Sequence, residues 1–248
     1  MSPRHGQAAT PGARTLAKSW HHSLRAEAMK LYSLPPVRLA AFATVALEGV
    51  VAKALAGGDS SMPHSQLLRS ATAYALIGMI VLAVLAGASE FSAHQVERSL
   101  LAVPSRSRLL ATKIAVLGGS FFAVAFLAGC VGVLVVSSGG TGLWRTGLAC
   151  ALFLTTMALF CAGVAFLLRN VVAALAACVV GLLVLPLVAR SLPGSEWLPS
   201  ELGQHLVDLA LHTSHTGPHP LAAAAALVAW LITAWALAIA RLMHGVLR

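Results

Sequence analysis

The sequence predicts an all-α, polytopic membrane protein with six transmembrane helices in a single domain over residues 1–248. Apolar residues make up 58% of the chain and charged residues only 10%, against about 25% charged in soluble domains. Six apolar stretches reach the roughly 20 residues that a helix needs to cross a bilayer. Backbone groups cannot stay unpaired in hydrocarbon, so these stretches should be helices. They are Val37–Ala56, Ala71–Gly87, Lys113–Val136, Leu148–Leu168, Val171–Ala189 and Leu221–Ala240.

The net charge of +9 is distributed as a topology signal. If six spans alternate across the membrane, four basic residues fall on one side: Lys53, Arg69, Arg145 and Arg190. The other thirteen fall opposite: Arg4, Arg14, Lys18, Arg25, Lys30, Arg38, Arg98, Arg106, Arg108, Lys113, Arg169, Arg241 and Arg248. Because basic residues accumulate on cytoplasmic loops, both termini of this multi-pass protein should be cytoplasmic. We interpret the charge as a partner for anionic lipids and expect no nucleic acid.

The region before the first span predicts an amphipathic helix in the membrane interface. Residues 1–13 should be a disordered tail, and residues 14–34 should hold the helix, with its apolar stripe and Trp20 toward lipid. Pro35 and Pro36 should end it. Glu27 lies on the apolar stripe, where it pairs with Lys30 or contacts another subunit or loop. The first 36 residues lack the apolar core of a cleaved signal.

Three connections are informative. The longest cytoplasmic loop should be Ser89–Arg108, with a short helix and a break at Pro104. Spans four and five are joined by little more than Arg169 and Asn170, which predicts a tight hairpin. Before the last span, Pro199–Leu211 predicts a short amphipathic helix against the outer leaflet or across the mouth of the bundle.

Sequence motifs for chemistry are missing. The chain has no phosphate-binding loop, no zinc-protease HExxH and no GxSxG nucleophile motif, so we expect no enzyme activity. The cysteines lie within spans, form no CxxC pair and should serve as small packing residues: Cys130, Cys150, Cys161 and Cys178. No internal repeat of the kind found in many secondary transporters is evident.

The spans contain one isolated carboxylate, Glu48, near the middle of the first span. An ionisable group there costs at least about 2.5 kcal/mol, so by default it indicates a function. It could meet a cationic substrate or a basic residue of another chain. The alternative is a protonated acid hydrogen-bonded to a neighbouring helix.

Histidines recur in the external segment. His205, Asp208, His212 and His215 fall roughly on one helix face, with His219 beyond them. Such spacing can hold zinc, but zinc sites show tighter pairing, so we interpret these side chains as solvated and predict no metal site.

Several segments together resemble the permease subunits of ABC-type exporters, the type 2 family that includes actinobacterial drug and antibiotic exporters. The strongest match is Ser89–Lys113, which carries the family's signature residues in order: Ser89, Glu90, Phe91, Leu101, Pro104, Arg106, Leu109 and Lys113. The segments Leu24–Pro36, Gly163–Leu175 and Leu192–Leu206 agree with the family pattern as well. The chain departs from it at His94–Glu97.

This resemblance implies a bacterial cell membrane, two permease chains, identical or paralogous, and two copies of a separate ATPase docked on the cytoplasmic face. ATP and Mg²⁺ would bind in that ATPase, and this chain would bind no cofactor. The residues expected to receive the ATPase are Glu27, Lys30, Glu90, Phe91, Glu97, Arg98, Pro104, Arg106 and Arg108. Glu48 is the candidate for the substrate path.

The sequence therefore favours a transport subunit that exports a hydrophobic or amphipathic drug, antibiotic, peptide or lipid. Two alternatives remain open. One is a transporter or channel that needs no ATPase, which would require more ionisable residues along the spans. The other is a membrane immunity or anchor protein that transports nothing.

Overall fold

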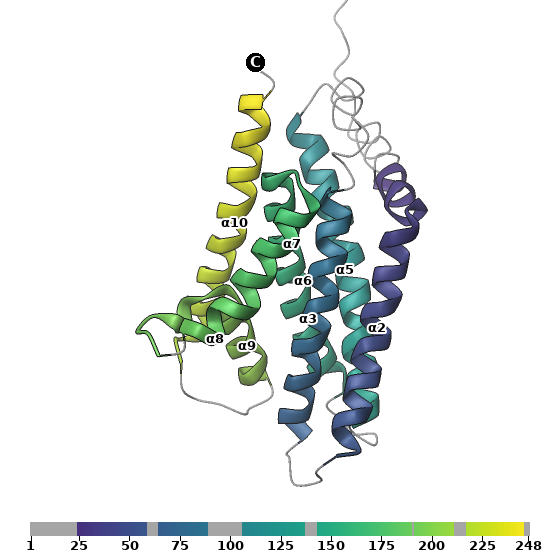
Figure 1. Cartoon of the computed structure of the whole chain (residues 1–248), viewed down its shortest axis with the longest axis vertical. Helices are drawn as coiled ribbons and strands as arrows, with labels where there is room; N and C mark the ends of the chain where they lie inside the picture. The colour runs from purple at the N-terminus through teal and green to yellow at the C-terminus, as the bar shows by residue number, and fades with distance from the viewer. Residues whose placement is uncertain are drawn as a thin grey trace, which may run out of the picture.

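The computed structural model describes residues 24–58, 64–88, 106–136, 143–189, 191–210 and 217–245 (Figure 1). Within these ranges the chain is helical and contains no strand, and six helices are long and apolar enough to cross a membrane. The prediction of an all-α, six-span membrane protein is confirmed. The helices are α2 (Pro35–Ala56), α3 (His64–Ala88), α5 (Arg106–Val136), α6 (Leu143–Leu168), α7 (Val171–Val179), α8 (Leu185–Ala189), α9 (Pro199–Ala210) and α10 (Pro220–Gly245).

Several helices are longer than the apolar stretches that predicted them. Helix α3 begins at His64, seven residues before the predicted span, and α5 begins at Arg106. The predicted cytoplasmic loop Ser89–Arg108 is therefore too long at its C-terminal end, because Arg106 and Arg108 belong to the first turn of α5. Hydrogen bonding along a helix does not stop where the side chains become polar, so hydropathy alone underestimates these helices.

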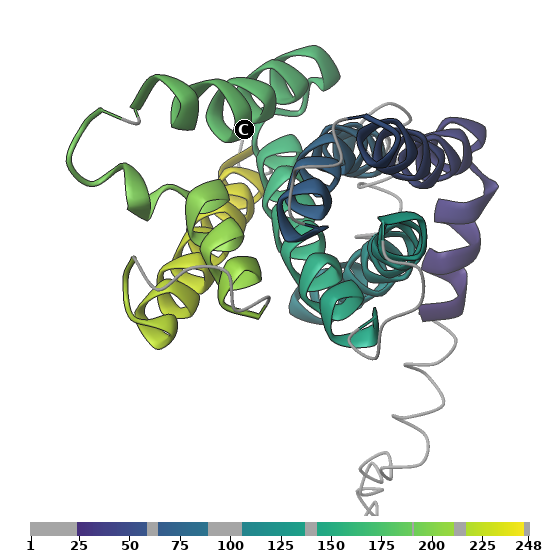
Figure 2. The same ribbon diagram turned by 90° about the horizontal axis from the view of Figure 1, so that it is seen from below.

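Helices α3 and α6 lie at the centre of the molecule. In the most apolar 18-residue stretch of each helix, 67% and 56% of the residues are buried. The corresponding shares for α2, for the span from α7 to α8 and for α10 are 17%, 22% and 28%. Viewed along the long axis, α2, α3, α5 and α6 group together, whereas α9 and α10 form a second group on the far side of α6 (Figure 2). The spans with small buried shares present their remaining faces outward, where lipid covers them.

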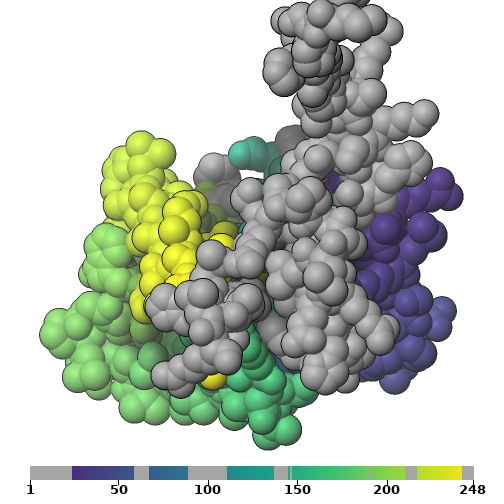
Figure 3. Space-filling view, turned by 90° about the horizontal axis from the view of Figure 1, so that it is seen from above, coloured from purple at the N-terminus to yellow at the C-terminus, as the bar shows by residue number. Residues whose placement is uncertain are grey.

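The two ends of the bundle differ in charge. One end carries the start of α2, the α6–α7 turn and the end of α10. Its described charges include one acid, Glu27, and six basic residues: Arg25, Lys30, Arg38, Lys113, Arg169 and Arg241. Figure 3 views this end, with α2 and α10 on opposite sides. The other end carries α9 and holds three basic residues, Lys53, Arg69 and Arg145, and three acids, Glu196, Glu201 and Asp208. The described residues thus keep the asymmetry expected of the positive-inside rule.

A short helix over residues 24–33 precedes α2. Leu34 separates the two with an extended backbone, and Pro35 occupies the first turn of α2. Proline disfavours a helical conformation in the preceding residue and suits the first helical turn, which explains both the break and the new start. The predicted break at Pro35 and Pro36 is confirmed, while residues 14–23 of the predicted interfacial helix lie outside the described residues.

The predicted hairpin between spans four and five is confirmed, and hydrogen bonds hold the ends of both helices. Arg169 takes a positive φ of 54°, and the side chain of Asn170 accepts hydrogen bonds from the backbone N–H groups of Val172 and Ala173 at 2.9 and 3.1 Å. From α10, Arg241 Nη1 donates to the carbonyl oxygen of Leu167 at 2.7 Å. These contacts satisfy polar groups that the ends of α6 and α7 leave unpaired.

The fifth span is less regular than its sequence predicted. Between α7 and α8 the chain makes a π-helical turn, η1 (Val180–Val184), in which the Leu185 N–H bonds to the Val180 carbonyl oxygen. Pro186 follows directly, and a proline inside a helix removes one N–H and crowds the carbonyl one turn before it. The wider turn accommodates that crowding, as π-turns in helices commonly do.

We predict that Asn170→Ala lowers the free energy of unfolding by about 1 kcal/mol, because it removes the cap of α7. Asn170→Ser should retain most of the stability, since serine caps nearly as well. Reversible unfolding in mixed detergent micelles measures both variants. Equal stability of the alanine and serine variants would contradict a capping role for this side chain.

Candidate functional site

The first candidate site surrounds Glu48, on the one face of α2 that is buried. The buried residues of this helix are Val37, Thr44, Glu48 and Ala52, which repeat at helical spacing. Its outer face exposes large apolar side chains such as Leu39 and Phe42. Glu48 is only 1% exposed, so the carboxyl group points into the bundle, as the sequence predicted for a group that avoids lipid.

Glycines bring the backbones of three helices close together around this face. A Cβ atom on Gly132 of α5 would lie 2.5 Å from Glu48 Oε1. A Cβ atom on Gly78 of α3 would lie 2.5 Å from Thr44 Oγ1 and 3.0 Å from the Thr44 Cα. Small residues at such crossings allow the close approach on which helix packing in membranes relies. The carboxyl group therefore sits directly against the α5 backbone.

Neither carboxyl oxygen of Glu48 has a hydrogen-bond partner among the described residues, and neither is accessible to solvent. The hydrogen-bonded acid considered from the sequence is thus not what the described residues form. An ionised, unpaired carboxylate would cost several kcal/mol here, so the enclosure favours the neutral acid. For the group to meet a cation or exchange a proton, α2 would have to move away from α5.

A second buried polar contact in the same bundle joins α3 to α6. The hydroxyl of Thr72 on α3 is buried, donates to the Leu68 carbonyl oxygen at 2.9 Å and contacts the sulfur of Cys150 on α6 at 3.5 Å. The cysteines form no disulfide, and three of the four are buried, in agreement with a packing role.

A second group of charged residues lies at the basic end. Glu27 and Lys30 of the helix over residues 24–33 line a small cavity of about 20 Å³ together with Lys113 of α5. Lys113 is 6% exposed, and its Nζ lies 5.4 Å from the ring centroid of Phe166 on α6. A cation over an aromatic face is stabilised by the ring quadrupole. The cavity thus joins the helix before α2 to the end of α3 and the start of α5, and Lys113 extends the contact to α6.

Most residues expected to receive an ATPase are outside the part of the chain that the structure describes. Glu90, Phe91, Glu97, Arg98 and Pro104 lie outside the described residues. Arg106 and Arg108 lie in the first turn of α5. Among the described residues, Glu27 and Lys30 of the predicted set lie together, and Lys113, a residue of the resembling segment with no predicted role, joins them.

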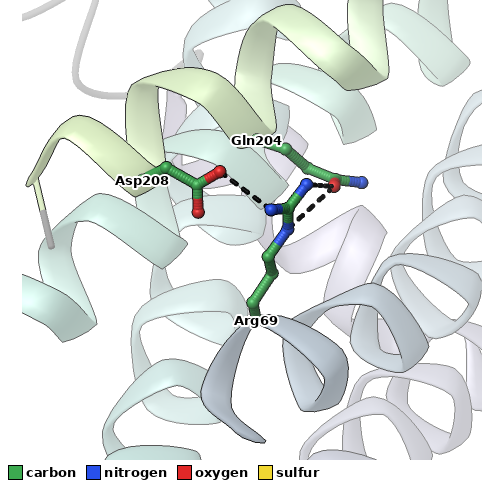
Figure 4. Close-up of polar contacts among 3 residues, drawn as sticks. All are labelled: Arg69, Gln204 and Asp208. Carbon is green, nitrogen blue, oxygen red and sulfur yellow. Dashed lines mark hydrogen bonds and ion pairs between the residues drawn. The ribbon is translucent and has the colours of Figure 1, made fainter. Parts of the chain in front are cut away.

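A polar clamp joins α3 to α9 at the opposite end. Arg69 Nη1 contacts Asp208 Oδ2 at 3.0 Å, and its Nη2 and Nε donate to Gln204 Oε1 at 3.0 and 3.3 Å (Figure 4). On the apolar side of α9, Leu202 is fully buried, and Gly203 leaves no room for a side chain against Phe153 of α6. The predicted short helix beginning at Pro199 is confirmed. It packs against α6 and α10 and contacts α3 through Arg69.

A cavity of about 390 Å³ opens beside this clamp. Its lining includes Glu196, Glu201, His205 and Asp208. His205 Nε2 makes a hydrogen bond with the Pro218 carbonyl oxygen at 3.0 Å. Among the described residues no three His, Cys, Asp or Glu side chains lie close enough to hold a metal ion, and His212 and His215 are outside those residues.

Sequence reasoning missed the clamp because Arg69 and Gln204 are 135 residues apart and nothing local pairs them. The available signal was weak: an arginine just before an apolar span, and a helix whose polar face carries acids. It also missed Gly132 and Gly78, whose role depends on which helices cross.

Comparison of the chain with protein-family models and with curated proteins finds no match.

We predict that Gly132→Ala lowers the free energy of unfolding by about 1–3 kcal/mol, the usual cost of an extra methyl group in a packed interior. The same change in a Glu48→Ala background should cost much less, because the clashing carboxyl is gone. Reversible unfolding in mixed detergent micelles gives the free energies of unfolding of the two single variants and the double variant.

Gly119→Ala is the matched control on α5, since a Cβ there would have no atom within 4 Å apart from the backbone of its own helix and its chain neighbours. We expect it to be neutral or slightly stabilising. If Gly132→Ala and Gly119→Ala behaved alike, the packing of the carboxyl against α5 would be wrong.

Proposed function

We propose that the chain is the membrane-spanning permease subunit of an ATP-driven exporter of the ABC type, working as a dimer with a separate ATPase. The resemblance of Ser89–Lys113 to the signature of that family carries the proposal. The last residues of this segment lie at the start of α5, at the basic end of the bundle, which the positive-inside rule assigns to the cytoplasm.

The need for a partner follows from what the chain lacks. It carries no phosphate-binding loop, and its spans hold a single carboxylate, so neither nucleotide hydrolysis nor a chain of proton-carrying side chains is available within the protein. A separate ATPase would supply the energy. The cargo would be hydrophobic or amphipathic, in keeping with spans composed of Leu, Val and Ala.

The contacts at the basic end offer a route for mechanical coupling. Glu27 and Lys30 share a cavity with Lys113, the last residue of the resembling segment. A push on the chain before α5 would act on Lys113, which is held between the helix over residues 24–33 and Phe166 of α6. Three helices would respond together, which is what a transmission element requires.

The central test is biochemical. We expect a soluble protein with a phosphate-binding loop, encoded by a neighbouring gene, to copurify with the chain and to hydrolyse ATP faster in the complex. The double variant Glu90→Gln, Glu97→Gln should reduce this stimulation about fivefold or more, in the range of typical coupling effects.

The matched control changes two acids at the opposite end, Glu196→Gln with Glu201→Gln, and should leave the stimulation intact. Transport by vesicles that contain only this chain, with no nucleotide-hydrolysing partner, would contradict the proposal. Equal loss in both double variants would argue against coupling through the segment before α5.

Glu48 provides a separate test of the substrate path. If the carboxyl group meets cationic cargo when α2 and α5 separate, Glu48→Gln should lower export of cations and spare neutral cargo. The fold should be unaffected, because glutamine has the shape and charge of the protonated acid. Export assays with matched charged and neutral substrates measure this, and unchanged export of every substrate would remove Glu48 from the path.

A further inference from the structure

A groove of about 170 Å³ lies where the helix over residues 24–33 and the start of α2 meet α3 and α5. Its walls are mainly apolar and include Val37, Leu82 and Phe121. The volume has room for about six groups the size of a water molecule or a methylene, at roughly 30 Å³ each. It therefore fits part of a hydrocarbon chain.

Three polar side chains line the same groove: Tyr32, Arg38 and Ser120. Tyr32 is 54% exposed, Arg38 is exposed and Ser120 is half-buried. None of the three side chains makes a hydrogen bond or an ion pair with any described residue. An unpaired hydroxyl at membrane depth and an unpaired guanidinium at its boundary both gain from a ligand that supplies acceptors.

The charge around the groove selects an anion. Arg38 lies in the first turns of α2, whose opening turn contains no acidic residue, and Leu34 gives the helix no side-chain cap. The positive end of the helix dipole is thus left uncompensated beside the guanidinium. Phosphate oxygens are suitable partners, because guanidinium can bind them through two hydrogen bonds.

The groove also lies at the depth of a lipid head group. Arg38 stands near the start of the first span, and the preceding helix holds Tyr32, the residue type that concentrates at membrane interfaces. The polar groups gather near that boundary, and the apolar wall continues from there along α3 and α5 into the span. A molecule with an anionic head and an acyl chain matches this order.

We propose that this groove is a binding site for an anionic phospholipid of the surrounding membrane. Its phosphate contacts Arg38 and Tyr32, one acyl chain lies along α5, and Ser120 donates to an ester oxygen. The site ties the helix over residues 24–33 to α2 and α5 through the lipid. It is independent of the exporter role, since it requires only the membrane and the described groove.

The test is native mass spectrometry of the full chain in detergent, titrated separately with phosphatidylglycerol and phosphatidylcholine. We expect tighter binding of phosphatidylglycerol. Arg38→Gln should lower its affinity about fivefold, the order of effect of one basic side chain at an anionic surface. Arg25→Gln is the matched control, because Arg25 is also an exposed arginine at the same end of the bundle, in the helix over residues 24–33, and lies outside the groove.

A second pair of variants tests the chain-binding part without changing charge. Val124→Trp fills the groove and should reduce binding of the lipid, whereas Leu127→Trp, at an exposed position of α5 outside the groove, should not. Ser120→Ala is a milder variant for use if the tryptophan prevents folding, and it should weaken binding measurably.

Specific outcomes would overturn the proposal. They are equal losses for Arg38→Gln and Arg25→Gln, equal affinity for the two lipids, or unchanged binding after both Val124→Trp and Ser120→Ala. Displacement of the lipid by inorganic phosphate alone would show that the site binds a free anion and does not require a phospholipid.

Discussion

The structure depends on one constraint, which is that hydrocarbon offers no water to a polar group. Helix formation satisfies the backbone hydrogen bonds within the spans, and specific side-chain contacts satisfy backbone groups at the helix ends. The carboxamide of Asn170 caps α7, and Arg241 covers a carbonyl at the end of α6. Within the bundle, threonine hydroxyls return to backbone carbonyls one turn earlier, as Thr44 and Thr72 do. Glu48 departs from this rule, since its oxygens have no partner among the described residues.

How far the sequence predicts the structure follows from the same constraint. Apolar length is dictated by the bilayer, so all six spans, the hairpin at Arg169 and the helix beginning at Pro199 could be located from residues alone. Helix ends could not, because α3 and α5 continue as helices past the hydrocarbon boundary, where hydropathy carries no signal. The π-turn before Pro186 also escaped prediction, since a proline in an apolar run permits a kink, a wider turn or a break, and the neighbouring helices decide among them.

The candidate sites divide in the same way. That Glu48 faces inward could be argued from one residue, because lipid excludes a carboxyl group. The contact between Glu48 and Gly132 could not be predicted in this way, because any glycine of α5 could have packed against α2. The clamp of Arg69 with Asp208 and Gln204 was equally hidden, since it joins helices separated by most of the chain. Long-range pairs of this kind depend on helix order around the bundle, which a single sequence does not encode in any local pattern.

Helix α2 differs from the other spans in how it is held. It has the smallest buried share, 17%, and it meets α3 and α5 through one narrow face built on glycine contacts. The carboxyl group of Glu48 is enclosed in that face without a hydrogen bond to any described residue. Separation of α2 from α5 would therefore break no hydrogen bond of Glu48, and it would expose the carboxyl oxygens to new partners. The helix over residues 24–33 continues directly into α2 and contributes to two cavities at the basic end. A displacement at that end would therefore act first on the span with the smallest buried share.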